Sequence, residues 1–144
     1  MKSSFSPLNI LLAAVMLGGL GVLSWQLFGG SSAAAAAVDV KVPMLSARAV
    51  AGRTAFDVNC ASCHGKSGSG TNLGPPLIHD IYNPGHHADE SFYRAVQQGV
   101  QRHHWQFGNM PPAPQVVESQ IADIVRYVRE LQEANGIFYK AHQM

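Results

Sequence analysis

The sequence has little charge and no excess of either sign. Only 13% of its 144 residues are charged, against about 25% in an average globular domain. Residues 38–144 carry nine Lys and Arg and nine Asp and Glu, so this part is formally neutral. Nucleic acid is bound through a basic surface, which this chain lacks, so we expect no nucleic acid among its partners.

Charge is almost absent from the N-terminal segment, where Lys2 is the one charged residue among the first 37. Residues 8–28 form an uncharged apolar run long enough for a helix across a hydrocarbon core of about 30 Å. A signal peptide has a shorter apolar region of about 7–15 residues, but residues 31–37 offer small-residue cleavage sites. We therefore expect residues 1–30 to be a membrane anchor, with a cleaved signal peptide as the alternative, and residues 31–45 to be a linker.

Strand patterns are missing as well, since no segment alternates apolar and polar residues over four clean positions. Helical spacing instead predicts helices over residues 46–59, 88–98 and 117–134. In the last of these, apolar residues step by four and three and so share one face: Val117, Ile121, Ile124, Val128 and Leu131.

Loops rich in glycine and proline separate these helices, over residues 60–82 and 103–115. The sequence therefore predicts an all-α domain over residues 46–136, followed by a short C-terminal tail at residues 137–144.

Cysteine is scarce, and both cysteines lie in the segment CASCH at residues 60–64. Two thiols three residues apart can form thioether bonds with the two vinyl groups of one haem, and His64 then reaches the iron. A zinc site would need two more ligands at metal spacing, and a disulfide oxidoreductase needs a βαβ context; the sequence offers neither. A structural disulfide would leave the position of His64 unexplained. The motif therefore predicts one covalent haem c attached through Cys60 and Cys63.

With this motif, the domain resembles the class I cytochromes c, specifically the small bacterial monohaem type. Gly52 and Phe56 match the family's glycine and aromatic on the first helix, and Ile124 and Tyr127 match the positions on the last helix against which they pack. The family's G-P-x-L segment appears as residues 74–77. The resemblance implies a cytochrome c-like fold of three or more helices with long loops around one haem.

The resemblance also implies further site residues. The carbonyl of Pro75 would accept a hydrogen bond from Nδ1–H of His64, Leu77 would contact the haem face, and Met110 would be the second axial ligand. Independently of the family, Met110 lies 46 residues after His64 with a predicted helix between them, as ligands on opposite haem faces require. The remaining methionines are poorly placed: Met1, Met16, Met44 and Met144.

Four histidines form two adjacent pairs, His86-His87 and His103-His104. Either His103 or His104 could replace Met110 as the sixth ligand of the iron. The two pairs together could also hold copper or zinc. Adjacent histidines point apart in most backbone conformations, so we expect solvated loop residues instead.

The expected function is one-electron transfer by a haem with His64 and Met110 as axial ligands, and not catalysis. Haem c is attached outside the cytoplasm, so we expect the haem domain to face the bacterial periplasm. It would be tethered to the inner membrane through residues 8–28, or soluble if that segment is cleaved, and would act with redox partner proteins. The alternatives are a haem-based ligand sensor or small haem enzyme with an open sixth position, and a haem subunit of a larger dehydrogenase or oxidase.

Overall fold

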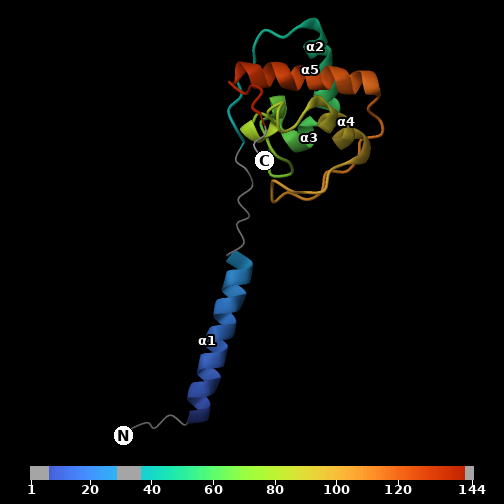
Figure 1. Cartoon of the computed structure of the whole chain (residues 1–144). Coiled ribbons are helices and arrows are strands. Elements are labelled where there is room, and N and C mark those ends of the chain that lie inside the picture. The colour runs from blue at the N-terminus through green and yellow to red at the C-terminus, as the bar shows by residue number, and fades with distance from the viewer. Residues whose placement is uncertain (1–6, 29–36, 142–144) are drawn as a thin grey trace. The chain divides into compact units, whose positions relative to one another are not determined.

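The computed structural model describes residues 7–28 and 37–141. Contacts divide the chain into two units, one built on helix α1 (Pro7–Phe28) and one that holds every other element (Figure 1). Within the described residues, no helix has both the length and the apolar character needed to cross a membrane. The anchor predicted at residues 8–28 is therefore helical but is not supported as a membrane span. The first part of the predicted linker, residues 31–36, and the last residues of the predicted tail, 142–144, lie outside the described residues.

The second unit is helical, as predicted, and the part of it that the structure describes contains no strand. Its helices are α2 (Ala47–Asn59), α3 (Ala61–His64), α4 (Asp89–Gln98) and α5 (Glu118–Ala134), with two 3₁₀ turns, η1 (Lys66–Gly68) and η2 (Asp80–Tyr82). Helices α2, α4 and α5 each begin one residue after the start predicted from spacing, and each ends at the predicted residue. The segment predicted as loop between residues 60 and 82 instead contains α3, η1 and η2.

Helices α2 and α5 cross at close range and form the main packing of the unit (Figure 1). At Gly52 the two backbones are so close that a Cβ would collide with the carbonyl of Asp123. One turn further along, the rings of Phe56 and Tyr127 meet edge to face with centroids 5.6 Å apart. Both side chains are fully buried. The predicted packing of Gly52 and Phe56 against α5 is therefore confirmed, because only glycine permits this approach.

The start of α2 is attached to α5 through Ser46 and Glu130. The Ser46 hydroxyl accepts a hydrogen bond from the N–H of Ala49 (3.2 Å) and donates one to Oε1 of Glu130 (2.6 Å). The Ser46 N–H donates to Oε2 of Glu130 (3.0 Å), and Nε of Arg126 donates to Oε1 (2.6 Å). Burial by itself raises the pKa of Glu130, but these hydrogen bonds outweigh it and hold the pKa below its ordinary value.

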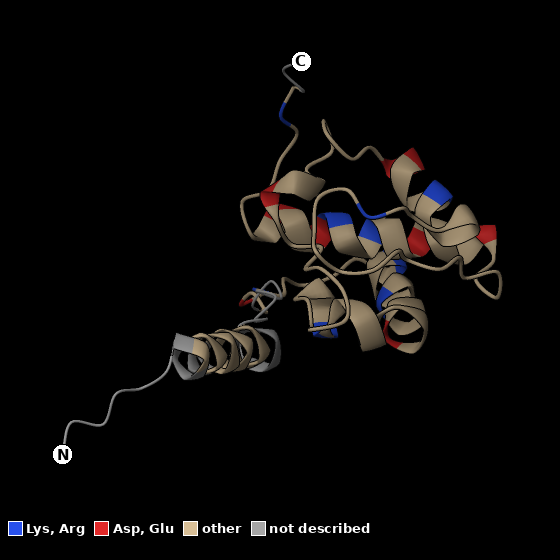
Figure 2. Cartoon of the chain, turned by 90° about the horizontal axis from the view of Figure 1, so that it is seen from below, with Lys and Arg blue, Asp and Glu red and all other residues tan. Residues whose placement is uncertain are grey.

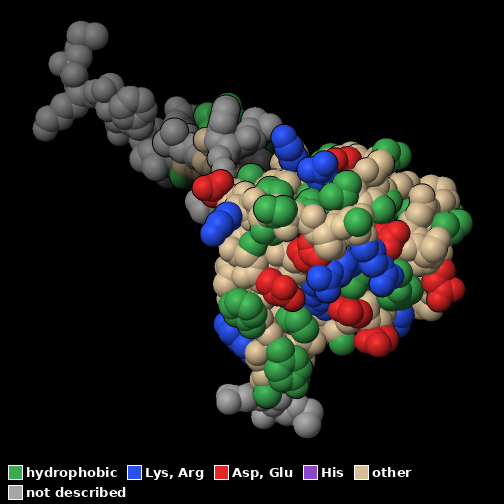
Figure 3. Space-filling view, turned by 90° about the horizontal axis from the view of Figure 1, so that it is seen from above, with side chains coloured by type: hydrophobic (Ala, Val, Ile, Leu, Met, Phe, Trp, Pro, Cys, Tyr) green, Lys and Arg blue, Asp and Glu red, His purple; other side chains and the backbone are tan. Residues whose placement is uncertain are grey.

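Charged side chains on the second unit are mixed in sign. Basic and acidic residues both occur along its helices (Figure 2) and lie side by side on the face shown in Figure 3. Arg48 pairs with Asp123 across α2 and α5 at 2.7 Å. Interspersed charges of this kind produce no strong field of a single sign.

Candidate functional site

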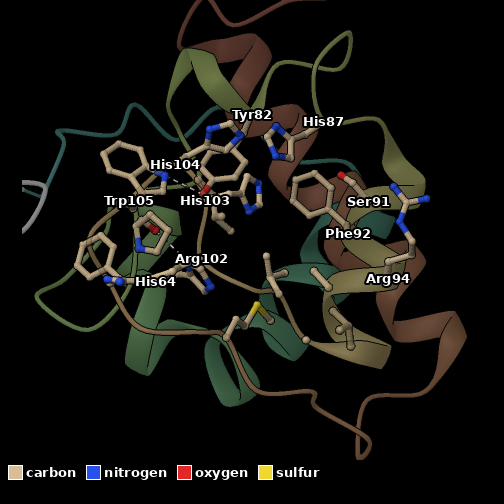
Figure 4. A pocket seen from close by; sticks show the side chains of 18 of the residues that line it. His64, Tyr82, His87, Ser91, Phe92, Arg94, Arg102, His103, His104 and Trp105 are labelled. Atoms are coloured by element: carbon tan, nitrogen blue, oxygen red, sulfur yellow. Dashed lines mark hydrogen bonds between the residues drawn. The ribbon is translucent and has the colours of Figure 1, made fainter.

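A cavity of about 740 Å³ opens between the loops and helices α2, α4 and α5 (Figure 4). This volume lies within the range of about 300–1,000 Å³ typical of small-molecule and cofactor sites. Its apolar lining includes Phe56, Val96 and Ile124. Five of the six site residues predicted from the sequence also line it: Cys60, His64, Pro75, Leu77 and Met110. The sixth, Cys63, is exposed on α3.

His64 ends the single turn of α3 and is held by the chain that follows it. Its Nδ1 lies 2.9 Å from the carbonyl oxygen of Pro75, the contact that the resemblance implies. Burial lowers the pKa of His64, and the hydrogen bond to Pro75 opposes part of this effect. A carbonyl accepts only from a protonated nitrogen, so Nδ1 carries the proton. The neutral ring therefore has Nε2 available as a metal ligand.

Both cysteines are free thiols, with Cys60 half-buried and Cys63 exposed. The N–H of Cys63 donates to the Cys60 carbonyl (3.1 Å), which places both residues within one helical turn. Burial, and then the neighbouring Cys63, raise the pKa of Cys60 to about 11. Redox-active C-x-x-C pairs have a lowered cysteine pKa, because the thiolate is the nucleophile. The environment of Cys60 therefore does not favour disulfide exchange.

Met110 is positioned by its backbone. Its N–H and carbonyl exchange hydrogen bonds with Val100, each 3.0 Å long, in an isolated antiparallel bridge. Gly99, directly before the bridge, has φ +77°, and a Cβ there would lie 2.5 Å from the Met110 carbonyl oxygen. The side chain of Asn109 adds a hydrogen bond from the N–H of Arg102 (3.1 Å). The loop that carries Met110 is thus closed at its base.

Two polar side chains of α5 hold backbone segments that line the cavity. Nε2 of Gln132 donates to the carbonyls of Leu77 (3.0 Å) and Tyr82 (3.1 Å). The guanidinium of Arg129 donates to the carbonyls of Tyr82 (2.9 Å) and His87 (2.6 Å). Both side chains are buried. Sequence reasoning missed them; the available signal was two polar residues directly beside the apolar stripe of α5, next to Val128 and Leu131.

Aromatic side chains complete the lining. Nε1 of Trp105 donates to the hydroxyl of Tyr82 (3.0 Å), which joins the loop after α4 to η2. Phe92 lies beneath Arg129, with the guanidinium carbon 4.9 Å from the ring centroid. Burial raises the pKa of Tyr82, and the hydrogen bond from Trp105 opposes this. The hydroxyl therefore stays protonated at neutral pH.

The four histidines gather at the cavity, and three of them, His86, His103 and His104, are exposed, as expected of solvated loop residues. Figure 4 shows His87, His103 and His104 with Tyr82 along one side of it, and His86 also lines it. The expectation that adjacent histidines point apart is wrong here, because the loops after η2 and α4 meet and bring the pairs together. Burial lowers the pKa of His87 and of His104, and the neighbouring histidines lower both further.

Comparison with known proteins identifies the family. A family model described as Cytochrome c matches residues 49–132, which is more than half of the chain. The chain belongs to the cytochrome c family. No curated protein and no solved structure is similar enough to count as a match. The predicted resemblance is confirmed at the family level, and the helical fold agrees with it.

Membership of the cytochrome c family implies haem c as the cofactor and electron transfer, rather than catalysis, as the general role. The residues present fit this group. The cavity is large and mainly apolar, the thiol of Cys60 lies at its wall, and Nε2 of His64 is available to a metal. Met110 adds a thioether at the same cavity.

Proposed function

We propose that this cytochrome c is a one-electron carrier. Its haem c would be held by thioether bonds to Cys60 and Cys63, with His64 and Met110 as axial ligands. When bound, haem c supplies an iron that alternates between the ferric and ferrous states. The observation that carries the proposal is that His64 and Met110, 46 residues apart in the chain, line one cavity together with Cys60.

Hydrogen bonds to backbone atoms position both proposed ligands, which favours a ligand set that does not change during the reaction. Pro75 holds the imidazole of His64 in one tautomer, and Val100 holds the backbone of Met110. If His64 and Met110 both bind the iron, no coordination position would be left for a substrate. This arrangement supports electron transfer over the alternative of a haem enzyme or ligand sensor.

The walls of the cavity favour the reduced state. Phe56, Val96 and Ile124 exclude water, and an apolar environment disfavours the additional positive charge of ferric iron. A thioether ligand has the same effect relative to a second imidazole. We therefore expect a higher reduction potential than that of a bis-histidine haem.

The partners we propose are redox proteins that dock briefly. The mixed charges in Figures 2 and 3 favour local complementarity over long-range steering. We further propose that the haem domain works in the periplasm, because covalent haem attachment takes place outside the bacterial cytoplasm.

The ligand set is tested by the optical spectrum of the purified holoprotein. We expect a weak ferric band at the red end of the spectrum, from sulfur-to-iron charge transfer, and its loss in Met110→Ala. Met44→Ala is the matched control, because Met44 is 99% exposed and precedes α2. This variant should keep the band.

Two results would overturn the proposal. One is a wild-type protein without the band, which would favour His103 or His104 as the sixth ligand. The other is rapid binding of carbon monoxide by the reduced wild type, which would show an open position and favour the sensor or enzyme alternative.

A further inference from the structure

Three histidines from two loops meet at the rim of the cavity: His86, His87 and His104. One ring nitrogen of each lies within 4.8 Å of the others. The Nε2 atoms of His86 and His104 are 3.2 Å apart. Two imidazoles on one tetrahedral metal ion, at metal–nitrogen distances of 2.0–2.1 Å, have their nitrogens about 3.3 Å apart. We propose that these three histidines bind one divalent transition-metal ion in addition to the haem iron.

His87 already has the contacts of a metal-binding histidine. Its Nδ1 lies 2.7 Å from the carbonyl oxygen of Ile81, so this nitrogen donates and Nε2 is left as the ligand atom. The carbonyl of His87 accepts a hydrogen bond from the buried Arg129 (2.6 Å). Ring and backbone are therefore both fixed, which reduces the ordering cost of binding.

The donor set indicates the class of metal. The group consists of imidazoles alone, without a carboxylate. Imidazole suits copper, zinc and nickel, whereas Mg²⁺ and Ca²⁺ require oxygen ligands. Among the divalent ions of the first transition row, Cu²⁺ binds such ligands most tightly. We therefore expect Cu²⁺ to bind more tightly than Zn²⁺, and Mg²⁺ not to compete.

The position of the group allows metal to enter. His86 and His104 are exposed, and His87 is half-buried. Three protein ligands on a tetrahedral ion leave one position for water or another small ligand. The site therefore lies between bulk solvent and the cavity that His64 lines.

A metal ion here would act on the haem through its charge. Two positive charges at the cavity rim disfavour ferric iron more than ferrous iron, so metal binding should raise the reduction potential. This coupling rests on the proposed electron-transfer function, whereas metal binding itself does not. The site would make electron transfer respond to the supply of the second metal.

The test uses the purified holoprotein with its haem bound. Titration with Cu²⁺ and with Zn²⁺ should give one ion per chain, and the electron paramagnetic resonance spectrum of the Cu²⁺ form should show coupling to nitrogen ligands. His104→Gln and His86→Gln should each weaken binding by at least tenfold, since even loss of an outer-shell partner typically costs about 10–100-fold. Both variants keep Cys60, Cys63, His64 and Met110, and their absorption spectra are recorded before each titration to verify that haem is bound.

His79→Gln is the matched control, because His79 is also exposed but does not line the cavity. It should bind Cu²⁺ as the wild type does. The coupling is measured separately, as the reduction potential with and without Zn²⁺, which has no redox chemistry of its own. We expect a rise that His104→Gln abolishes.

Several results would overturn the site. They are unchanged affinity in His104→Gln, equal loss in His79→Gln, competition by Mg²⁺, or binding only to protein from which the haem is absent. If one ion binds but Zn²⁺ does not change the reduction potential of the haem, the coupling is overturned and the metal site is retained. A wild-type protein that lacks the charge-transfer band but still binds one Cu²⁺ ion through His104 would overturn the proposed haem ligands alone, so failure of the ligand set and failure of the metal site are distinguishable.

Discussion

Val100 and Met110 face each other across the base of one loop and exchange two backbone hydrogen bonds of 3.0 Å. The pair is the one bridge of β type among the described residues, and it places the Met110 side chain at the cavity. The segment between them, residues 101–109, is thereby closed at its base, which fixes the backbone of Met110. The position of this proposed ligand therefore depends on residues other than Met110 itself.

Gly99→Ala should displace Met110. The new Cβ would lie 2.5 Å from the Met110 carbonyl oxygen, and φ of +77° is unfavourable for alanine. We expect destabilisation of about 1–3 kcal/mol and a weakened charge-transfer band, measured by thermal unfolding and optical spectroscopy.

Gly136→Ala separates the two causes in that variant. Gly136 has nearly the same φ, +78°, but nothing lies within 4 Å of its added Cβ. Gly136→Ala should lower the free energy of unfolding by the conformational strain alone, about 1 kcal/mol, and leave the optical spectrum unchanged. Equal spectra of Gly99→Ala and Gly136→Ala would contradict the role given to the bridge.

Gly52→Ala should weaken the α2–α5 packing. The methyl group would collide with the backbone carbonyl of Asp123, which cannot move without shifting α5. We expect a loss of about 2–3 kcal/mol in the free energy of unfolding, in the upper range for overpacking. Gly108→Ala, whose Cβ would meet nothing within 4 Å, should change stability by less than about 0.5 kcal/mol. Unfolding of both holoproteins in denaturant measures the difference.

The three helices were predictable because their signals are local. The spacing of apolar residues located α5, and Gly52 with Phe56 indicated where α2 would meet it. Ser46 is the N-cap of α2, a residue type favoured there because its hydroxyl accepts a hydrogen bond from the N–H of Ala49. The N-terminus of α5 has no capping side chain before it that the sequence could indicate. Instead, the side chain of Gln120, inside the helix, accepts a hydrogen bond from the N–H of Val117 (3.2 Å).

The contacts between loops were not predictable from spacing. His86 and His104 are 18 residues apart, and their meeting depends on how two irregular segments return to the cavity. The roles of Arg129 and Gln132 depend on carbonyls that lie 42 to 55 residues away in the chain. The spacing of apolar residues in one helix indicates which face is buried, but it does not indicate which distant backbone atoms contact that face.

Glu130→Gln should alter the dependence of stability on pH. The folded pKa of Glu130 lies below its unfolded value, so its stabilising contribution is present above the unfolded pKa and is lost as pH falls through the folded pKa. Wild-type stability should therefore fall more steeply than that of Glu130→Gln as pH decreases from about 5. Thermal unfolding over this range measures the difference. Glu133→Gln, an exposed position on α5, should follow the wild-type curve.

Arg129→Met should release the loop that follows η2. The carbonyl of His87 would lose its donor and that of Tyr82 would keep only the one from Gln132, and an unsatisfied buried group costs about 1–3 kcal/mol. We expect a total loss on the order of 3 kcal/mol and faster amide hydrogen exchange between residues 79 and 88. Arg48→Met, which removes an exposed ion pair, should cost less than about 1 kcal/mol. Equal exchange in the two variants would contradict the anchoring role of Arg129.

Arg129 and Gln132 hold the cavity wall by its carbonyls, and a carbonyl is present at every residue whatever its side chain. The loop can therefore exchange its side chains while its path along α5 stays the same. The position of the cavity wall thus depends on two buried polar residues of α5, whereas its chemical character depends on the side chains of the loop. Substitutions at Leu77 or His87 can change what the cavity presents to its contents without requiring a new fold.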